Sequence, residues 1–252
     1  MPIMLDSHAH YDLPVFDDIR DAIFAELKRQ GINKVILPGT DINQIDRQLQ
    51  VAKQFDCGFG LGIHPWNVPD DIPKALCQLE HVIKQQLTQP NFVAIGECGL
   101  DKLRPNFAEQ QALLVGQLQL AQKYDLPVIL HCVKSHDLLL KALQSAQLNR
   151  KGVVHGFYGA PALALRYVKL GYKLGIGDLL LNHNAHKLKQ TVETLPLETL
   201  LVETDTAQLP HDDINNGEKL HSIVKNIAQL QNISTVLAAK QLDMNALQLY
   251  DL

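Results

Sequence analysis

The sequence predicts an α/β protein of the (β/α)8-barrel class. Short apolar runs alternate with longer amphipathic segments from one end of the chain to the other, and there are eight such apolar runs. The length of 252 residues also matches the usual size of one barrel of this kind. Because no low-complexity linker or shift of composition marks a boundary, we expect residues 1–252 to form one domain.

Each repeat unit consists of an expected strand followed by an expected helix. Near-continuous apolar strands separated by helices are typical of a parallel sheet that is covered on both sides, and eight units favour closure into a barrel. A doubly wound open sheet is the alternative. Two helices close the chain, one after about residue 215 and one from Ser234, with a break near Asn232. The expected strands are 3–5, 34–37, 58–63, 92–96, 127–130, 152–154, 172–176 and 199–203, and the expected helices are 17–30, 42–54, 72–87, 107–124, 136–146, 162–170 and 183–194.

Composition and charge limit the class of function. Hydrophobic residues make up 46% and charged residues 20% of the chain, which is an ordinary globular balance. The net charge of −4 provides no overall positive field to attract nucleic acid or an anionic membrane. Any polyanion must therefore be bound by a local patch. Nothing in the sequence indicates an obligate protein partner.

Cysteines and chain ends indicate a cytoplasmic protein. The four cysteines show no close-paired spacing, which argues against a thiolate zinc cluster or a dithiol redox pair. The first residues do not resemble a secretory signal, and no segment approaches the roughly 18 apolar residues of a membrane span.

Potential ligands gather at the expected strand ends. In a β/α barrel the functional groups lie at the carboxyl ends of the strands, where the βα loops line one shared mouth. Six of the eight expected strand ends carry a side chain that can bind a metal ion or a phosphate. These side chains are His8 and His10, His64, Glu97, His131, His155, and Glu203 with Asp205.

The first strands supply an H-x-H pair and a buried carboxylate. His8 and His10 in D-S-H-A-H are two residues apart, so both can face the mouth and bind one ion. Glu97 directly follows an apolar run, where a carboxylate is costly unless a cation or hydrogen bonds offset it. Its two oxygens allow it to bridge two ions. The same period of two places Cys98 opposite Glu97 and Cys132 opposite His131, so both thiols point away from the mouth. This favours packing roles for them.

The later strands add two histidines and two carboxylates. His131 ends P-V-I-L-H and His155 ends G-V-V-H, and a single histidine in such a place is usually structural. Two on consecutive strand ends favour metal binding. In L-V-E-T-D, Glu203 and Asp205 share a face, with Asp205 able to reach a metal or its water and Glu203 deeper.

This set of side chains predicts metal-assisted hydrolysis. A bound ion lowers the pKa of a water molecule, and a carboxylate takes the proton as the water attacks. The mixed histidine and carboxylate set admits Zn, Mn, Co or Mg. The chain has no G-x-S-x-G, P-loop or dinucleotide G-x-G-x-x-G motif in the required setting, which argues against acyl-enzyme, nucleotide-hydrolase and dehydrogenase chemistry.

Six motifs together resemble the TatD family of metal-dependent deoxyribonucleases. They are D-S-H-A-H, G-I-H-P, A-I-G-E-C-G-L-D, P-V-I-L-H, G-V-V-H-G-F-Y-G and L-L-V-E-T-D, in the family's order over about residues 4–205. The resemblance implies a TIM barrel of the amidohydrolase type with two divalent metal ions. It also implies hydrolysis of phosphodiester bonds in DNA, often from a 3′ end, by a metal-activated water.

The resemblance also assigns roles to individual residues. Glu97, Glu203 and Asp205 are the expected catalytic carboxylates, with Glu203 orienting the site, and His64 is expected beside the metals as a phosphate contact. The first metal would be held by His8, His10 and Asp205, the second by His131 and His155, and Glu97 would bridge them.

The chain departs from the family pattern near the expected substrate surface. The family usually has Arg two residues after His131, whereas here Val133 stands there and Lys134 follows. Lys134 is therefore expected to contact phosphate, as a point charge rather than a bidentate group. Lys102 and Arg104 are further candidate cations. Ala207, the residues 215–218 and the residues 177–180 also differ from the pattern.

These departures keep two other functions open. One is a small-molecule amidase, lactonase or phosphoesterase that uses the same metals, since such sites accept several hydrolytic substrates. The other is a barrel that binds without turnover, which the complete set of ligands disfavours.

Overall fold

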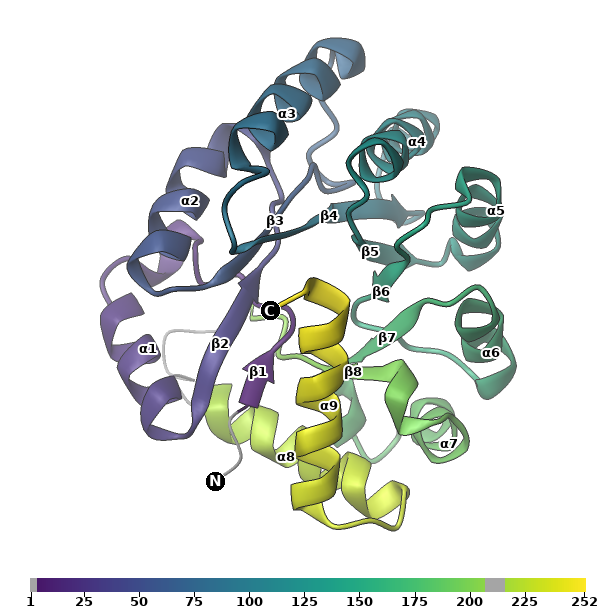
Figure 1. The fold of residues 1–252 in the computed structure, drawn as a ribbon. Coiled ribbons are helices and arrows are strands. Elements are labelled where there is room, and N and C mark those ends of the chain that lie inside the picture. The colour runs from purple at the N-terminus through teal and green to yellow at the C-terminus, as the bar shows by residue number, and fades with distance from the viewer. Residues whose placement is uncertain (1–3, 207–215) are drawn as a thin grey trace.

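A computed structural model describes residues 4–206 and 216–252 of the chain. Eight parallel strands form one sheet in the order β1 to β8, and the helices lie outside it (Figure 1). The strands are β1 (Met4–Asp6), β2 (Ile32–Leu37), β3 (Gly58–Leu61), β4 (Phe92–Asp101), β5 (Val128–Val133), β6 (Gly152–Val154), β7 (Lys173–Ile176) and β8 (Leu200–Val202).

Hydrogen bonds across the seam between β8 and β1 bring the sheet close to full closure. The backbone N–H of Ser7 donates to the Val202 carbonyl at 3.0 Å, and the Ser7 hydroxyl donates to the same oxygen at 2.9 Å. One step further, Asp205 N–H donates to the His8 carbonyl at 2.9 Å. The predicted (β/α)8 barrel is therefore confirmed, and the open-sheet alternative is wrong.

The helices follow the predicted amphipathic segments closely. The bounds of α4 and α5 match the expected segments, whereas α1 begins at Arg20 rather than at residue 17. The Arg20 side chain donates to the carbonyls of Tyr11 and Leu13, which holds the preceding turn outside the helix. The helices are α1 (Arg20–Arg29), α2 (Ile45–Gln54), α3 (Ile72–Gln86), α4 (Phe107–Tyr124), α5 (His136–Ala146), α6 (Pro161–Lys169), α7 (His186–Thr194), α8 (Asn216–Leu230) and α9 (Thr235–Tyr250), with short 3-10 turns η1 (Pro14–Phe16), η2 (Ile42–Gln44), η3 (Asp178–Leu181) and η4 (Leu197–Thr199).

Strand β4 extends beyond the expected end at residue 96. It continues to Asp101, so Glu97 lies within the strand rather than directly after it. The register with β5 shifts between Ile95 and Cys98. Pairing then resumes with Cys98 opposite Leu130, which places Gly99 opposite His131. A Cβ at Gly99 would lie 2.0 Å from the His131 carbonyl oxygen, so only glycine allows this approach.

The barrel interior is apolar at one end and polar at the other. Ile129, Val153 and Leu201 pack with Ala246 and Tyr250 of α9. Because side chains alternate along a strand, the next inward-facing position on each of these strands lies two residues further along the chain, at the polar end. These positions are His131, His155 and Glu203. Helix α9 therefore covers the amino end of the barrel, and the carboxyl end is left for the site.

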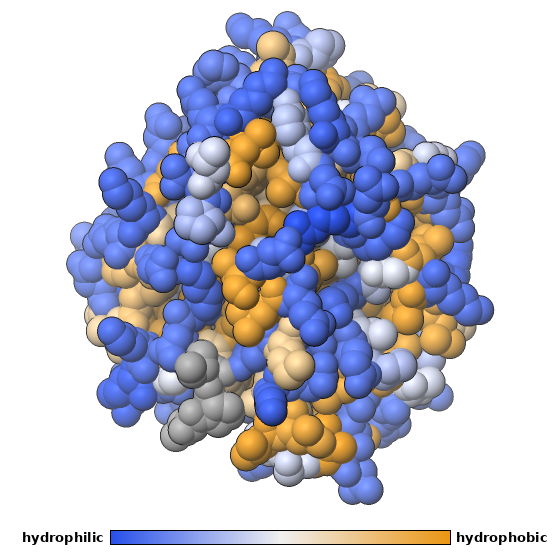
Figure 2. Space-filling view, in the orientation of Figure 1, coloured by the Kyte–Doolittle hydropathy of each residue, from blue (hydrophilic) through white to orange (hydrophobic). Residues whose placement is uncertain are grey.

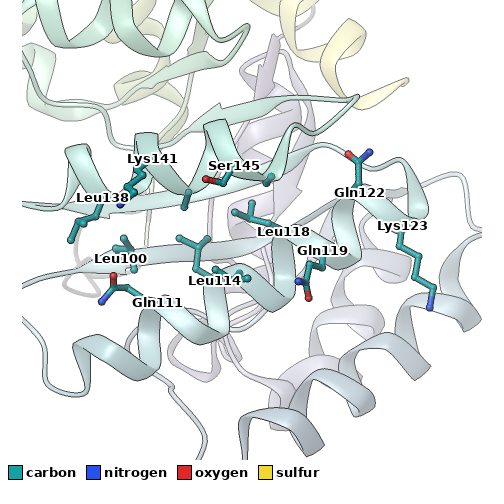
Figure 3. A pocket seen from close by; sticks show the side chains of 13 residues that line it. Leu100, Gln111, Leu114, Leu118, Gln119, Gln122, Lys123, Leu138, Lys141 and Ser145 are labelled. Atoms are coloured by element: carbon teal, nitrogen blue, oxygen red, sulfur yellow. The ribbon is translucent and has the colours of Figure 1, made fainter.

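The face shown in Figure 2 is mostly hydrophilic, with apolar side chains between the polar ones. A groove of about 620 Å³ lies between α4 and α5 (Figure 3). It is lined mainly by aliphatic and amide side chains and shares no lining residue with the cavity at the carboxyl end of the barrel. Within the described residues, no helix is both long and apolar enough to cross a membrane.

Asn245 of α9 provides a test of how the helix stabilises the barrel. Its buried side-chain amide donates to the carbonyls of Leu197 and Leu200, both at 2.8 Å. Asn245→Ala leaves both carbonyls buried without this donor, so we expect a loss of about 2–4 kcal/mol of unfolding free energy. Chemical denaturation measures it. Gln248→Ala, at an exposed position of the same helix, should change stability by less than about 0.5 kcal/mol. Equal stability of the two variants would contradict the account.

Candidate metal centre

The carboxyl end of the barrel brings all six expected metal ligands together. His8 and His10 follow β1, Glu97 lies in β4, His131 lies in β5, His155 follows β6 and Asp205 follows β8. They gather around the carboxylate of Glu97, which is only 1% exposed.

One oxygen of Glu97 faces the histidines that follow β1. Glu97 Oε2 lies 3.2 Å from His8 Nε2 and 3.5 Å from His10 Nε2. Those two nitrogens are 3.1 Å apart. Asp205 Oδ1 completes this group, 3.7 Å from His8 Nε2 and 3.5 Å from His10 Nε2.

The other oxygen of Glu97 faces a second set of nitrogens. Glu97 Oε1 lies 2.7 Å from His155 Nε2 and 3.1 Å from His131 Nδ1, and these nitrogens are 3.1 Å apart. His64 Nε2 lies 3.1 Å from the same oxygen. His64 was expected as a phosphate contact, but it lies as close to Glu97 as His131 does, and these three residues form a group that could hold one ion.

The spacing of these atoms fits divalent metal ions. Ligands around a tetrahedral ion with bonds of about 2.0–2.1 Å lie about 3.3 Å apart. The separations of 3.1–3.7 Å within the first group agree with this value. Imidazole nitrogens that face each other so closely need a proton or a cation between them, because their lone pairs repel. The donor set therefore fits one ion at each oxygen of Glu97.

The carboxylates of the site favour positive charge at His10. Burial lowers the pKa of His10, but hydrogen bonds and charges from Asp205 and Glu97 outweigh burial and raise it to about 10. Burial raises the pKa of Glu97, yet the surrounding His155, His64 and His8 hold it well below its ordinary value. A cation is thus stabilised where the proton of His10 would sit.

The two carboxylates after β8 lie in different surroundings. The side chain of Asp205 is 42% exposed and lines the cavity. Glu203 is fully buried, and its Oε1 accepts a hydrogen bond from Gly156 N–H. A Cβ at Gly175 would lie 2.1 Å from Glu203 Oε2, so glycine makes room for the carboxylate. Burial raises the pKa of Glu203 to about 8. Glu203 does not line the cavity, but it lies close enough to His155 and Asp205 for their charges to affect its pKa.

A cavity of about 530 Å³ opens over Glu97 and the histidines around it. Lys134 was expected to contact phosphate there, but it does not line this cavity within the described residues. Its side chain is exposed and its backbone is left-handed, with φ of 50°. Ala207 and Asn215 lie outside the described residues. The lining residues are His10, Leu13, Thr40, Gln44, His64, Trp66, Asn67, Glu97, His131, His155, Asp178, Thr204, Asp205 and Lys219.

Sequence reasoning missed two buried carboxylates that hold the site together. Asp6 accepts hydrogen bonds from His8 N–H at 3.2 Å and from Thr204 N–H at 3.1 Å, which joins the ends of β1 and β8. Asp101 accepts one from Trp66 Nε1 at 2.7 Å and lies 3.7 Å from His131 Nε2. Both stand inside quoted motifs, as the first residue of D-S-H-A-H and the last of A-I-G-E-C-G-L-D. Trp66 and Lys219 were also missed.

Comparison with known proteins identifies the family. The chain matches the sequence model of TatD related DNase over residues 5–251. It is 38% identical over 209 residues, which are 82% of this chain and 80% of the relative, to an uncharacterized metal-dependent hydrolase, YjjV, of Escherichia coli K12. The crystal structure of E. coli YjjV aligns with a TM-score of 0.89 at 32% identity, covering 99% of this chain and 98% of that one. The 3′-5′ ssDNA/RNA exonuclease TatD of E. coli K12 is 28% identical over 261 residues, 98% of each chain. This chain therefore belongs to the TatD family and is a metal-dependent hydrolase that acts on ester bonds.

Proposed function

We propose that this protein is a deoxyribonuclease that hydrolyses phosphodiester bonds of single-stranded DNA with two divalent metal ions. The observation that carries the proposal is the position of Glu97, whose two oxygens face separate sets of histidine nitrogens on the floor of an open cavity. Two-metal hydrolases hold their ions about 3.5–4 Å apart, and many of them cleave phosphate esters. The exonuclease activity named for the relative TatD supports DNA as the substrate.

The proposed ligands form two groups that share Glu97. His8, His10 and Asp205 would hold the first ion with Oε2, and His131 and His155 would hold the second with Oε1. His64 lies within reach of the second ion. When bound, ions at these places stabilise negative charge on the phosphate and lower the pKa of water. Zn, Mn, Co and Mg all suit this mixed donor set.

Asp205 is the proposed general base. It lines the cavity, and part of its carboxylate stays open to solvent. Burial raises its pKa, but the hydrogen bond from His10 and the charges of His155 and His8 hold it below the ordinary value. Asp205 is therefore ionised at neutral pH and able to accept the proton of an attacking water molecule. Glu203, buried beneath it, is proposed to orient the site.

A phosphoesterase, amidase or lactonase acting on small molecules is the second candidate. It is favoured because Val133 stands where the family usually has Arg, and because Lys134 does not line the cavity. Among the described residues, Lys219 is the lysine or arginine that lines the cavity, and its Nζ lies 3.9 Å from Asp178 Oδ2. A panel of chromogenic phosphodiesters, esters and lactones distinguishes this candidate from the deoxyribonuclease. The small-molecule hydrolase requires turnover of compounds in the panel and no cleavage of DNA.

We further propose that the enzyme works in the cytoplasm. All four cysteines are free, and two of them, Cys57 and Cys98, are buried. Free thiols persist in a reducing compartment, where disulfides are rare.

The metal proposal predicts the effect of Glu97→Gln. The purified protein should hold about two divalent ions per chain, and Glu97→Gln should hold fewer than about one, because the bridging charge is lost. Elemental analysis measures the content, and metal addition should raise the melting temperature of the stripped wild type. Glu109→Gln, at an exposed position of α4, is the control and should bind metal normally. Full metal content in Glu97→Gln would exclude Glu97 as the bridge.

The nuclease proposal predicts the effect of Asp205→Asn. Loss of a general base lowers the rate by about 10²–10⁴-fold, and the substitution also weakens a proposed metal ligand. Cleavage of end-labelled single-stranded DNA should therefore fall by at least that factor, and wild-type cleavage should stop in chelator. Asp18→Asn, an exposed carboxylate on the surface, should cleave at the wild-type rate. If the wild type leaves single-stranded DNA intact with each of Mg²⁺, Mn²⁺, Co²⁺ and Zn²⁺, DNA is not the substrate.

A further inference from the structure

An exposed tryptophan stands beside the second group of metal ligands. Trp66 is 46% exposed, lines the cavity and is the only tryptophan in the chain. Its ring centroid lies 5.1 Å from that of His64 and 6.2 Å from that of His131. Tryptophan is usually well buried, because its large apolar surface stabilises a core. Packing of the barrel therefore does not account for this position.

Two contacts hold the indole, and a third holds the backbone of Trp66. Its Nε1–H donates to Asp101 Oδ2 at 2.7 Å, and its backbone N–H donates to His64 Nδ1 at 3.1 Å. The guanidinium carbon of Arg104 lies 4.0 Å from the ring centroid. Asp101 is only 3% exposed, and its Oδ2 lies 4.0 Å from Arg104 Nε. The ring is thus preorganised, which reduces the entropy lost when a ligand binds to it.

Arg104 covers the indole from outside the cavity. Trp66 lines the cavity, whereas Arg104 is not among the residues that do so in the described part of the chain. Trp66 therefore borders the cavity beside the guanidinium, and 46% of its surface stays exposed. An exposed aromatic ring offers its surface to a second planar group, and a cation over the ring adds to the attraction.

We propose that Trp66, supported by Arg104, is a stacking subsite for one nucleobase of the strand that is cleaved. The inference rests on the proposed function and names a residue that selects the substrate. Bases stack on exposed aromatic rings with little regard to sequence, and only an unpaired base is free to do so. Trp66 therefore favours single strands and frayed ends over intact duplex, and it holds the strand beside His64 and His131.

The sole tryptophan makes the subsite directly measurable. Metal-loaded wild-type protein is titrated with a phosphorothioate-linked oligodeoxyadenylate, which resists cleavage, while the fluorescence of Trp66 is followed. We expect saturable quenching. A phosphorothioate oligonucleotide of the same length that lacks the bases at its 3′ end should bind about 5- to 150-fold more weakly. This is the range for loss of one stacked base.

A pair of variants tests the consequence for turnover. Trp66→Ala should raise KM for single-stranded DNA by about 5- to 150-fold, with a smaller change in kcat. Leu237→Ala removes a side chain that is 52% exposed on α9 and should leave KM unchanged.

The outcomes separate this inference from the proposed function. Quenching that is equally strong with the oligonucleotide that lacks its 3′ bases, or DNA cleavage without any quenching, would overturn the stacking subsite and leave the nuclease intact. Base-dependent quenching by a protein that cleaves no DNA would support the subsite and overturn the nuclease. The absence of both signals would overturn both.

Discussion

The buried carboxylate of Glu97 is the constraint on which the rest of the site depends. It is almost wholly removed from solvent, and histidine nitrogens face it at 2.7–3.5 Å on both oxygens. A charge in such a place is stable only if positive charge lies beside it. Protons cannot serve this purpose on every ring, because the imidazole nitrogens in each group are 3.1 Å apart and like charges would repel. The two shared cations that we propose would satisfy all of these groups at once.

Closure of the barrel and assembly of the site are the same structural event. His8 and Asp205 come from opposite ends of the sheet, and they meet only because β1 and β8 lie side by side. Asp205 N–H donates to the His8 carbonyl, and Asp6 accepts hydrogen bonds from the backbones of both loops. Burial raises the pKa of Asp6, and this effect outweighs the hydrogen bonds from Thr204 and His8, so that the pKa is about 7. Metal binding at this seam should therefore stabilise the fold, since folding creates the site.

Much of the fold and of the ligand set could be predicted from the sequence, because barrel strands place function at their carboxyl ends. His131 and His155 follow apolar runs, and the period of two predicts their direction. The end of β4 was predicted too early, since an apolar run stops at Glu97 while pairing with β5 continues. Lys134 was assigned because it follows Val133, which stands where the family usually has Arg, but its backbone is left-handed and its exposed side chain does not line the cavity. The role of Trp66 could not be predicted, because it depends on Asp101, which is 35 residues away at the end of β4.

The most direct test of the account is a crystal structure of the metal-loaded protein with anomalous diffraction measured at the absorption edge of its metal. We predict two anomalous peaks about 3.5–4 Å apart, one at each oxygen of Glu97. The first should contact His8, His10 and Asp205, and the second His131 and His155. A fully loaded protein with one peak only, or with peaks beyond coordinating distance of Glu97, would contradict the shared carboxylate and with it the central claim.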